Sequence, residues 1–193
     1  MNQRLLTIKA SNDVCADEIK HLSAIAGMLD IEHCAIDLNG EIDSFEKELC
    51  DAGKYDFLYL GAHANTESFG ESDGCPTYAW DELALALCSS DCLNYGSVLM
   101  LGCCRGGLKE VAYQLFCACD KIDYICGPRW TVTGPDISAG FHVYIYNHVV
   151  RREQPSTSIM RASKATGYDF FIYDRVELED EIEAYRNRMQ RAP

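Results

Sequence analysis

The sequence predicts a doubly wound α/β domain with three layers and a mostly parallel sheet, and three observations support this prediction. Short apolar runs alternate with segments of helical periodicity along the chain. Several runs are apolar on both faces, as in parallel strands that helices cover on both sides. The 193 residues suffice for a hydrophobic core and contain no internal repeat or clear linker, so we expect one domain over residues 1–193.

The predicted strands are short apolar runs that end at turn-forming or polar residues. They cover residues 4–9, 32–38, 57–61, 97–102, 123–127 and 169–173. The runs FLYLG (57–61) and SVLMLG (97–102) lack a regular polar alternation, which indicates that both are buried strands.

The predicted helices carry apolar residues three or four positions apart. They cover residues 17–29, 43–49, 80–87, 106–119, 137–150, 156–166 and 177–191. We expect Asp43 or Ser44 to cap the second helix, and Gly106 and Gly107 to open the fourth. The polar stretch 65–77 predicts a long surface loop or a small hairpin, and such loops are often functional.

The charge and the composition exclude several classes of partner. The formal net charge of -13 disfavours a nucleic-acid partner, because phosphate binding requires a basic face. The charge serves solubility, or it attracts basic segments of other proteins. No apolar stretch approaches the roughly 20 residues of a membrane span. The first residues lack the features of a signal peptide, so we expect a cytoplasmic protein without membrane contact.

The chain contains eleven cysteines, which we expect to be reduced thiols in the cytosol. No C-x-x-C pair occurs, so we expect neither a metal site nor a cofactor. Most of the cysteines fall in apolar patterns and are interpreted as small core residues.

Reactive side chains follow two of the buried strands. His63 comes directly after the third predicted strand, and Cys103 and Cys104 follow the fourth. If these strands are neighbours, their carboxyl ends lie side by side at the edge where α/β sheets bind ligands. A thiol needs a partner such as imidazole to form thiolate near neutral pH, and a helix that opens after Cys104 would favour thiolate further. The alternatives are a packed cysteine beside a loop histidine, or a vicinal redox pair of Cys103 and Cys104, which disulfide geometry disfavours.

Two segments around these residues resemble a known clan of peptidases. YDFLYLGAHAN (55–65) resembles the His strand of caspase-like peptidases, and SVLMLGCCRGG (97–107) resembles their Cys strand. WTVTGPD (130–136), RREQPS (151–156) and MRAS (160–163) resemble the CHAT branch of that clan. The resemblance implies a caspase-hemoglobinase-like fold and a cysteine endopeptidase that cleaves a protein substrate through a thioester.

The resemblance also implies the roles of individual residues, over roughly residues 50 to 165. Cys104 precedes an x-x-Gly turn as the nucleophile of the clan does, with His63 as its partner, whereas Cys103 lies one residue too early and is interpreted as a packed neighbour. The backbone N–H groups of Ala64 and Cys104 would form the oxyanion hole, although Ala64 stands where the clan usually has Gly. No third catalytic residue is identified, and a backbone carbonyl or Asn65 could orient the imidazole.

The segment from Arg129 to Asp136 resembles the wall of the clan's S1 pocket, the pocket for the residue before the cleaved bond. Asp136 would favour a basic side chain there, whereas Arg105 or Arg129 would favour an acidic one. Asp136 is equally well interpreted as the N-cap of the following helix. Trp130 either lines the pocket or is an ordinary core aromatic residue.

Two other functions remain open at this point. The first is a catalytically inactive caspase-like module that binds protein partners, because a fold does not determine activity. The second is a nucleotide-binding flavodoxin-like domain, which the lack of a G-x-G-x-x-G or Walker pattern argues against. As CHAT domains commonly accompany sensor domains, the resemblance also implies a separately encoded activator or sensor protein, in a bacterial defence or signalling setting.

Overall fold

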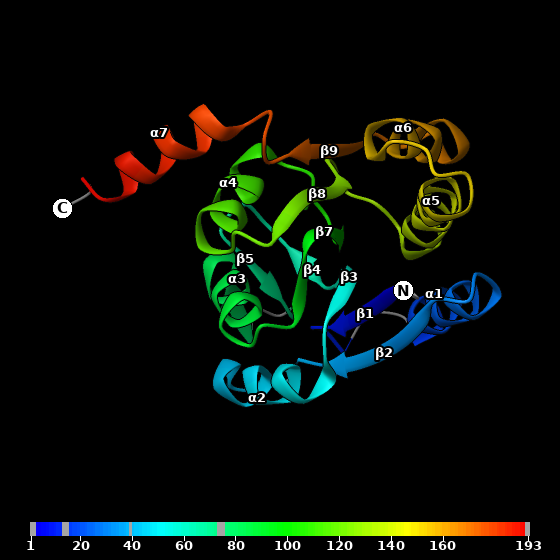
Figure 1. Ribbon diagram of the computed structural model, residues 1–193, viewed down its shortest axis with the longest axis horizontal. Helices are drawn as coiled ribbons and strands as arrows, with labels where there is room; N and C mark the ends of the chain where they lie inside the picture. Colours follow the sequence, from blue (N-terminus) through cyan, green and yellow to red (C-terminus); the bar gives the residue numbers. More distant parts are fainter. Residues whose placement is uncertain (1–2, 13–15, 39, 73–75, 192–193) are drawn as a thin grey trace.

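A six-stranded sheet forms the middle of the protein, for which a computed structural model describes residues 3–12, 16–38, 40–72 and 76–191 (Figure 1). In spatial order the strands are β2 (Glu32–Asp37), β1 (Arg4–Lys9), β3 (Tyr55–Gly61), β7 (Leu93–Gly102), β8 (Ile122–Pro128) and β9 (Phe170–Asp174). The first five are parallel, and β9 is antiparallel to β8. The predicted α/β class and mostly parallel sheet are therefore confirmed.

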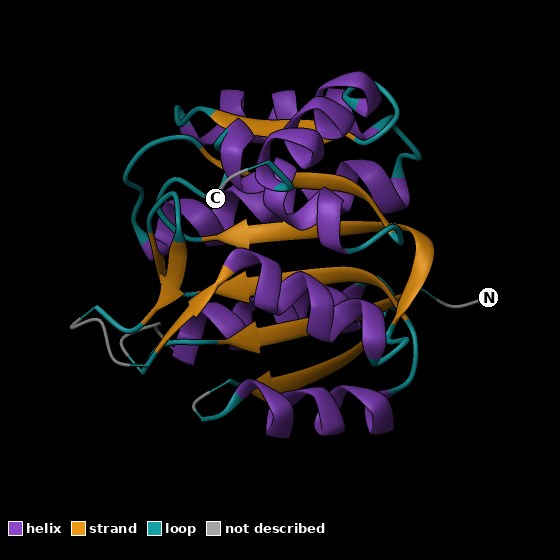
Figure 2. Ribbon diagram, turned by 90° about the vertical axis from the view of Figure 1, so that its left-hand side faces the viewer, coloured by secondary structure: helices purple, strands orange, loops and turns teal. Residues whose placement is uncertain are grey.

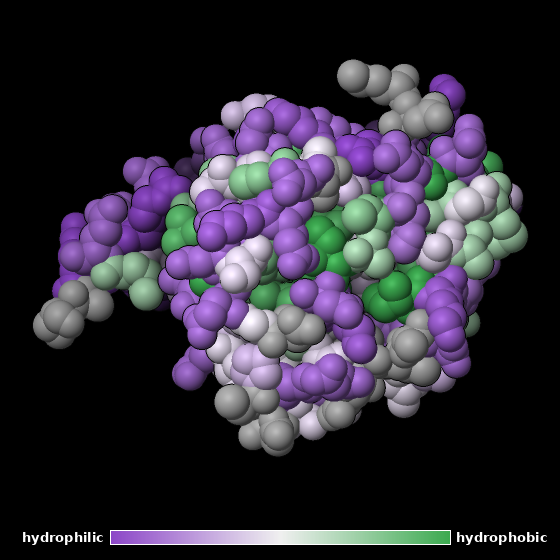
Figure 3. All heavy atoms as spheres, turned by 90° about the horizontal axis from the view of Figure 1, so that it is seen from below, coloured by the Kyte–Doolittle hydropathy of each residue, from purple (hydrophilic) through white to green (hydrophobic). Residues whose placement is uncertain are grey.

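Helices cover both faces of the sheet (Figures 1 and 2). One layer contains α1 (Ala16–Met28), α5 (Gly134–Ile145) and α6 (Pro155–Thr166), and the π-helix η1 (Tyr146–Val150) continues α5. The other contains α2 (Ile42–Ala52), α3 (Trp80–Ser89), α4 (Lys109–Ala118) and α7 (Glu179–Met189). Within the described residues, none of the helices has the length and apolar character needed to cross a membrane. Figure 3 shows mostly hydrophilic side chains over the face seen from below.

Side-chain alternation along the strands divides the core between these layers. Phe57 and Tyr59 of β3 belong to the apolar cluster under α1, α5 and α6, whereas Leu58 and Leu60 belong to the cluster under α2, α3 and α4. All four are at most 2% exposed, and burying each such side chain stabilises the fold by roughly 1.5–3 kcal/mol. These buried central strands therefore form a rigid support for the residues that follow their carboxyl ends.

The strand order reverses between β1 and β3, because the chain runs outward from β1 to β2 and then returns to the other side of β1. Next to this point, β3 and β7 are hydrogen-bonded neighbours, and Gly61 pairs with Gly102 at their carboxyl ends. Such switch points are where open α/β sheets bind ligands.

A small antiparallel sheet follows β3 and contains β4 (His63–Ala64), β5 (Ser68–Gly70) and β6 (Thr77–Ala79). The sequence predicts either a long surface loop or a small hairpin for residues 65–77, and the antiparallel pairing of β5 with β6 confirms the hairpin. Residues 73–75 lie outside the described residues. The carboxylate of Glu71 binds the hydroxyl of Ser11 at 2.8 Å and the backbone N–H of Asn12 at 2.7 Å. The hairpin is thereby attached to the segment after β1.

The starts of three helices differ from the sequence prediction by three residues or in the residue at the cap position. The cap position of α2 is Glu41 rather than Asp43 or Ser44, and α5 begins at Gly134, where a proline in the first turn favours initiation. The fourth predicted helix, α4, begins at Lys109 instead of residue 106. A Cβ on Gly107 would clash with the carbonyl oxygen of Gly127, so the glycines serve a turn packed against β8. The prediction that a helix end lies directly after Cys104 is therefore wrong.

Candidate active site

The pairing of β3 with β7 places His63 and Cys104 at one edge of the sheet. Gly61 and Gly102 are register partners, and each reactive residue lies two positions beyond its glycine. Both residues line the same cavity of about 210 Å³, which lies between the strand ends and the start of α5. The predicted meeting of the two strand ends is therefore what the structure shows.

The two adjacent cysteines have different environments. Cys103 is 1% exposed, and burial, assisted by the nearby Cys104 and Glu18, raises the pKa of its thiol far above the usual value. Cys103 therefore stays protonated at neutral pH. Cys104 is half-buried, and its Sγ lies 3.9 Å from the carbonyl oxygen of Val132 at the cavity wall. Of the two thiols, Cys104 is the one that a substrate could reach.

The turn after β7 shapes the surroundings of Cys104. Arg105 has a φ of 63°, a left-handed conformation that costs energy for a side chain other than glycine and is common at functional sites. A Cβ on Gly106 would lie 2.6 Å from Leu101 Cβ and 2.9 Å from Cys103 Sγ, so only glycine fits there. The turn is consequently held in one conformation by its neighbours.

Backbone N–H groups in this turn are mostly occupied. The amide of Arg105 donates to Trp130 O at 3.4 Å, and the amide of Gly106 donates to Cys103 O at 3.2 Å. In the part of the chain that the structure describes, the amide of Cys104 has no backbone acceptor. It can therefore serve as the predicted oxyanion donor without breaking another bond.

The second predicted donor, the amide of Ala64, lies on β4. The amide of Asn65 donates to Ser68 O at 2.9 Å where the hairpin closes, and Ala64 is the register partner of Phe69. Hydrogen-bonded and non-hydrogen-bonded pairs alternate along antiparallel strands, so the Ala64–Phe69 pair is of the second kind. The N–H of Ala64 consequently faces away from β5, and this orientation is compatible with the predicted role.

His63 is exposed and borders two hollows, the cavity of Cys104 and a second one of about 230 Å³ under the hairpin. The side-chain oxygen of Asn65 accepts hydrogen bonds from the backbone N–H groups of Glu67 at 2.7 Å and Ser68 at 2.8 Å. Asn65 therefore stabilises the hairpin turn, and these bonds engage the oxygen that was considered for orienting the imidazole.

Glu18, on α1, is a site residue that the sequence analysis missed. It lines the cavity of Cys104 while only 7% of its surface is exposed, and it accepts a hydrogen bond from the hydroxyl of Tyr59. Burial raises the pKa of Glu18 to about 7, although the Tyr59 hydrogen bond acts in the opposite direction. The signal that could have found it is its position four residues before Leu22, on the apolar face of the helix.

Two glycines make room for this buried carboxylate. A Cβ on Gly102 would collide with the phenol of Tyr59, and a Cβ on Gly134 would lie 3.0 Å from Glu18 Oε2. Glu18 therefore lies against the first residue of α5, where the positive end of the helix dipole partly offsets the cost of its charge. The packing of the fold therefore holds the Glu18 carboxylate at the cavity.

The four predicted substrate-binding residues lie outside the wall of this cavity. Arg105 and Arg129 are exposed, and the guanidinium of Arg129 lies 5.1 Å from the ring centre of Phe171. Trp130 is 62% exposed, so its interpretation as a core aromatic residue is wrong. Asp136 accepts a hydrogen bond from the hydroxyl of Thr133, which occupies the cap position of α5, so the N-cap interpretation of Asp136 is also wrong.

Neither a family model nor a curated protein matches this sequence. Within residues 3–12, 16–38, 40–72 and 76–191, no group of three or more His, Cys, Asp or Glu side chains is placed to hold a metal ion. The functional interpretation therefore depends on the geometry around Cys104 itself.

Proposed function

We propose that this chain is a cysteine endopeptidase of the caspase-like clan, similar to its CHAT branch. The observation that carries the proposal is the Gly61–Gly102 pairing, which brings His63 and Cys104 to one cavity at the carboxyl edge of the sheet. The buried state of Cys103 and the glycine-dependent turn after Cys104 support the assignment of Cys104 as nucleophile.

In the proposed reaction, the Cys104 thiolate attacks the carbonyl carbon of the scissile peptide bond. The amides of Cys104 and Ala64 stabilise the negative oxygen of the tetrahedral intermediate. His63 donates a proton to the leaving amine, which leaves the acyl group on Cys104 as a thioester. His63 then removes a proton from water, and the resulting attack releases the carboxylic acid and restores the thiol.

The proposed substrate carries a basic side chain, arginine or lysine, directly before the cleaved bond. Glu18 supports this choice because its carboxylate forms part of the same cavity that holds Cys104. A bound cation would offset the cost of the buried negative charge, whereas an acidic side chain would add to it. Glu18 thereby takes the place that was predicted for Asp136.

The cellular setting is also part of the proposal. The cysteines in the described part of the chain are all free thiols, which suits a peptidase in the reducing cytoplasm. The substrate is a protein, and a separately encoded activator or sensor protein controls the activity.

Hydrolysis of three fluorogenic peptides tests the proposal, with Arg, Asp or Leu before the cleaved bond. We expect the wild-type protein to prefer the Arg peptide, and Glu18→Gln to lose about tenfold or more in kcat/KM for that peptide alone, because a buried charge pair is lost. Asp136→Asn is the matched control and should keep the preference.

Other results would redirect the interpretation. A preference for the Asp peptide would favour Arg105 or Arg129 as the selecting residue. A folded wild-type protein that cleaves none of the peptides, with or without cell extract as a source of activator, would favour the inactive module that binds protein partners.

A further inference from the structure

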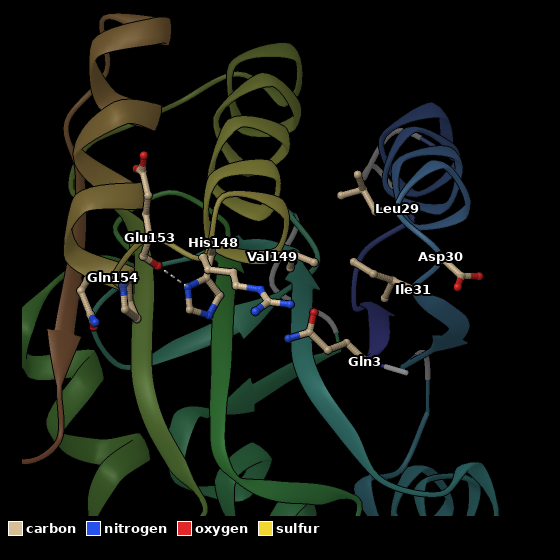
Figure 4. A pocket seen from close by; sticks show the side chains of 10 residues that line it. Gln3, Leu29, Asp30, Ile31, His148, Val149, Glu153 and Gln154 are labelled. Atoms are coloured by element: carbon tan, nitrogen blue, oxygen red, sulfur yellow. Dashed lines mark hydrogen bonds between the residues drawn. The ribbon is translucent and has the colours of Figure 1, made fainter. Parts of the chain in front are cut away.

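A cavity larger than that of Cys104 lies at the opposite edge of the sheet, where strands β1 and β2 begin (Figure 4). It has a volume of about 620 Å³ and is bordered by Gln3 before β1, Leu29 to Ile31 before β2, and the end of η1 with the following turn. Pockets for small molecules commonly have volumes of roughly 300–1,000 Å³. Nothing in the proposed peptidase reaction uses this cavity.

Unusual backbone conformations surround it. Asp30 and Arg152, with φ of 57° and 55°, are both in the left-handed region, and η1 is a π-helix. Such strained residues and π-helical turns occur preferentially at functional sites. The fold therefore maintains a costly local structure on two sides of one cavity.

His148 is held in one orientation at the cavity wall. Its Nδ1 lies 3.0 Å from the carbonyl oxygen of Glu153 (Figure 4). Its ring stacks on Tyr144 with centres 5.7 Å apart. A carbonyl oxygen only accepts, so the hydrogen of this bond is on Nδ1. Among the described residues, the other ring nitrogen, Nε2, has no hydrogen-bond partner.

In the described part of the chain, the cavity wall carries one basic side chain, Arg152, and two acidic ones, Asp30 and Glu153. Residues 146–166 contain four basic residues, Arg151, Arg152, Arg161 and Lys164, and one acidic residue, Glu153, in a chain of net charge -13. The Glu153 carboxylate lies 2.6 Å from Nε of Arg161, which offsets its charge. Figure 4 shows the Asp30 carboxylate directed away from His148. An anion in the cavity could therefore pair with Arg152, because one carboxylate of the wall pairs with Arg161 and the other points away from His148.

We propose that this cavity binds a small molecule that carries a phosphate group, about the size of a nucleoside monophosphate. Arg152 supplies the planar fork of donors that fits a phosphate, and His148 and the amide of Gln3 supply further polar contacts. The apolar walls of Leu29, Ile31 and Val149 accommodate the uncharged part of the ligand. This site is independent of the peptidase proposal.

Isothermal titration of the full chain with AMP tests the proposal, with adenosine as the uncharged probe. We expect saturable AMP binding that inorganic phosphate weakens by competition, and no comparable binding of adenosine. Arg152→Gln should weaken AMP binding about tenfold or more, because a charge-assisted hydrogen-bond pair is lost. Arg151→Gln is the matched control, since it removes the same charge one residue away and should change the affinity by less than about threefold.

Circular dichroism establishes that each variant is folded, and Arg152→Lys, which keeps the charge and loses the fork, should bind with intermediate affinity. The proposal is overturned if the wild-type protein shows no saturable binding of AMP, or if adenosine binds as tightly as AMP. It is also overturned if Arg151→Gln and Arg152→Gln weaken binding equally, because a diffuse positive surface would then explain it.

Discussion

The two ends of the sheet differ in how they build a cavity and in the side chains they place there. At the carboxyl end, the register of β3 and β7 positions His63 and Cys104 above the buried carboxylate of Glu18. At the amino end, a π-helix and left-handed turn residues place His148 and Arg152 beside a larger hollow. The register of the strands positions the reactive groups at one end, and the connections between strands and helices form the cavity at the other.

Substituting one histidine at each end should distinguish the roles of the two cavities most clearly. His63→Ala should lower kcat/KM for an Arg peptide by about 10²–10⁴-fold, because the proton donor for the leaving amine is lost. Its stability should change little, since His63 is exposed. His148→Ala should keep hydrolysis and lose about 1–2 kcal/mol of stability, because it breaks a ring stack and a hydrogen bond.

Peptide hydrolysis and urea unfolding of both variants measure these effects. If His148→Ala abolishes hydrolysis while His63→Ala leaves it intact, the assignment of hydrolysis to the carboxyl-end cavity is contradicted.

The buried acid at the carboxyl end should give a distinctive pH dependence of stability. The pKa of Glu18 is raised to about 7 in the folded protein, so its protonated form favours folding below the unfolded pKa, and this contribution is lost as pH rises through about 7. Glu18→Gln, which cannot ionise, should therefore be more stable than wild type at pH 8 by up to about 3 kcal/mol and nearly equal to it at pH 4.

Urea unfolding of both proteins across this pH range tests the sign. A stability difference that stays constant from pH 4 to pH 8 would show that Glu18 does not titrate in this way.

Adding one methyl group at Gly102 should disturb the carboxyl-end cavity specifically. A Cβ there would collide with the phenol of Tyr59, which donates a hydrogen bond to Glu18. We expect Gly102→Ala to cost about 1–3 kcal/mol, as overpacking in a core does, and to weaken the preference for the Arg peptide. Gly27→Ala is the control, because a Cβ there would meet no atom within 4 Å. Equal unfolding midpoints for the two variants would argue against this packing.

The smallest effect concerns Trp130, whose side chain is 62% exposed. Trp130→Ala should change the stability by less than about 1 kcal/mol, whereas a core tryptophan would cost about 3–5 kcal/mol. Thermal or urea unfolding distinguishes the two. A loss in the larger range would mean that Trp130 is packed in solution.

The sequence could predict the strands of the sheet and the two residues at their ends, because apolar runs without alternation identify buried parallel strands. It could not predict the register that pairs Gly61 with Gly102, since this depends on contacts between distant segments. The glycines at 106 and 107 resemble a helix start, yet packing against β8 requires them in a turn. The sequence could not predict that Glu18 is a site residue, because its burial depends on Tyr59 and Gly134, which are far away in the sequence.

Covalent labelling with a peptidyl acyloxymethyl ketone that carries lysine at its reactive end tests the assignment of the carboxyl-end cavity most directly. Mass spectrometry of the digested protein should locate the adduct on Cys104, with the same labelling in Cys103→Ala and none in Cys104→Ala or His63→Ala. An adduct on Cys103, or labelling of Cys104 that persists undiminished in His63→Ala, would contradict the proposed pair.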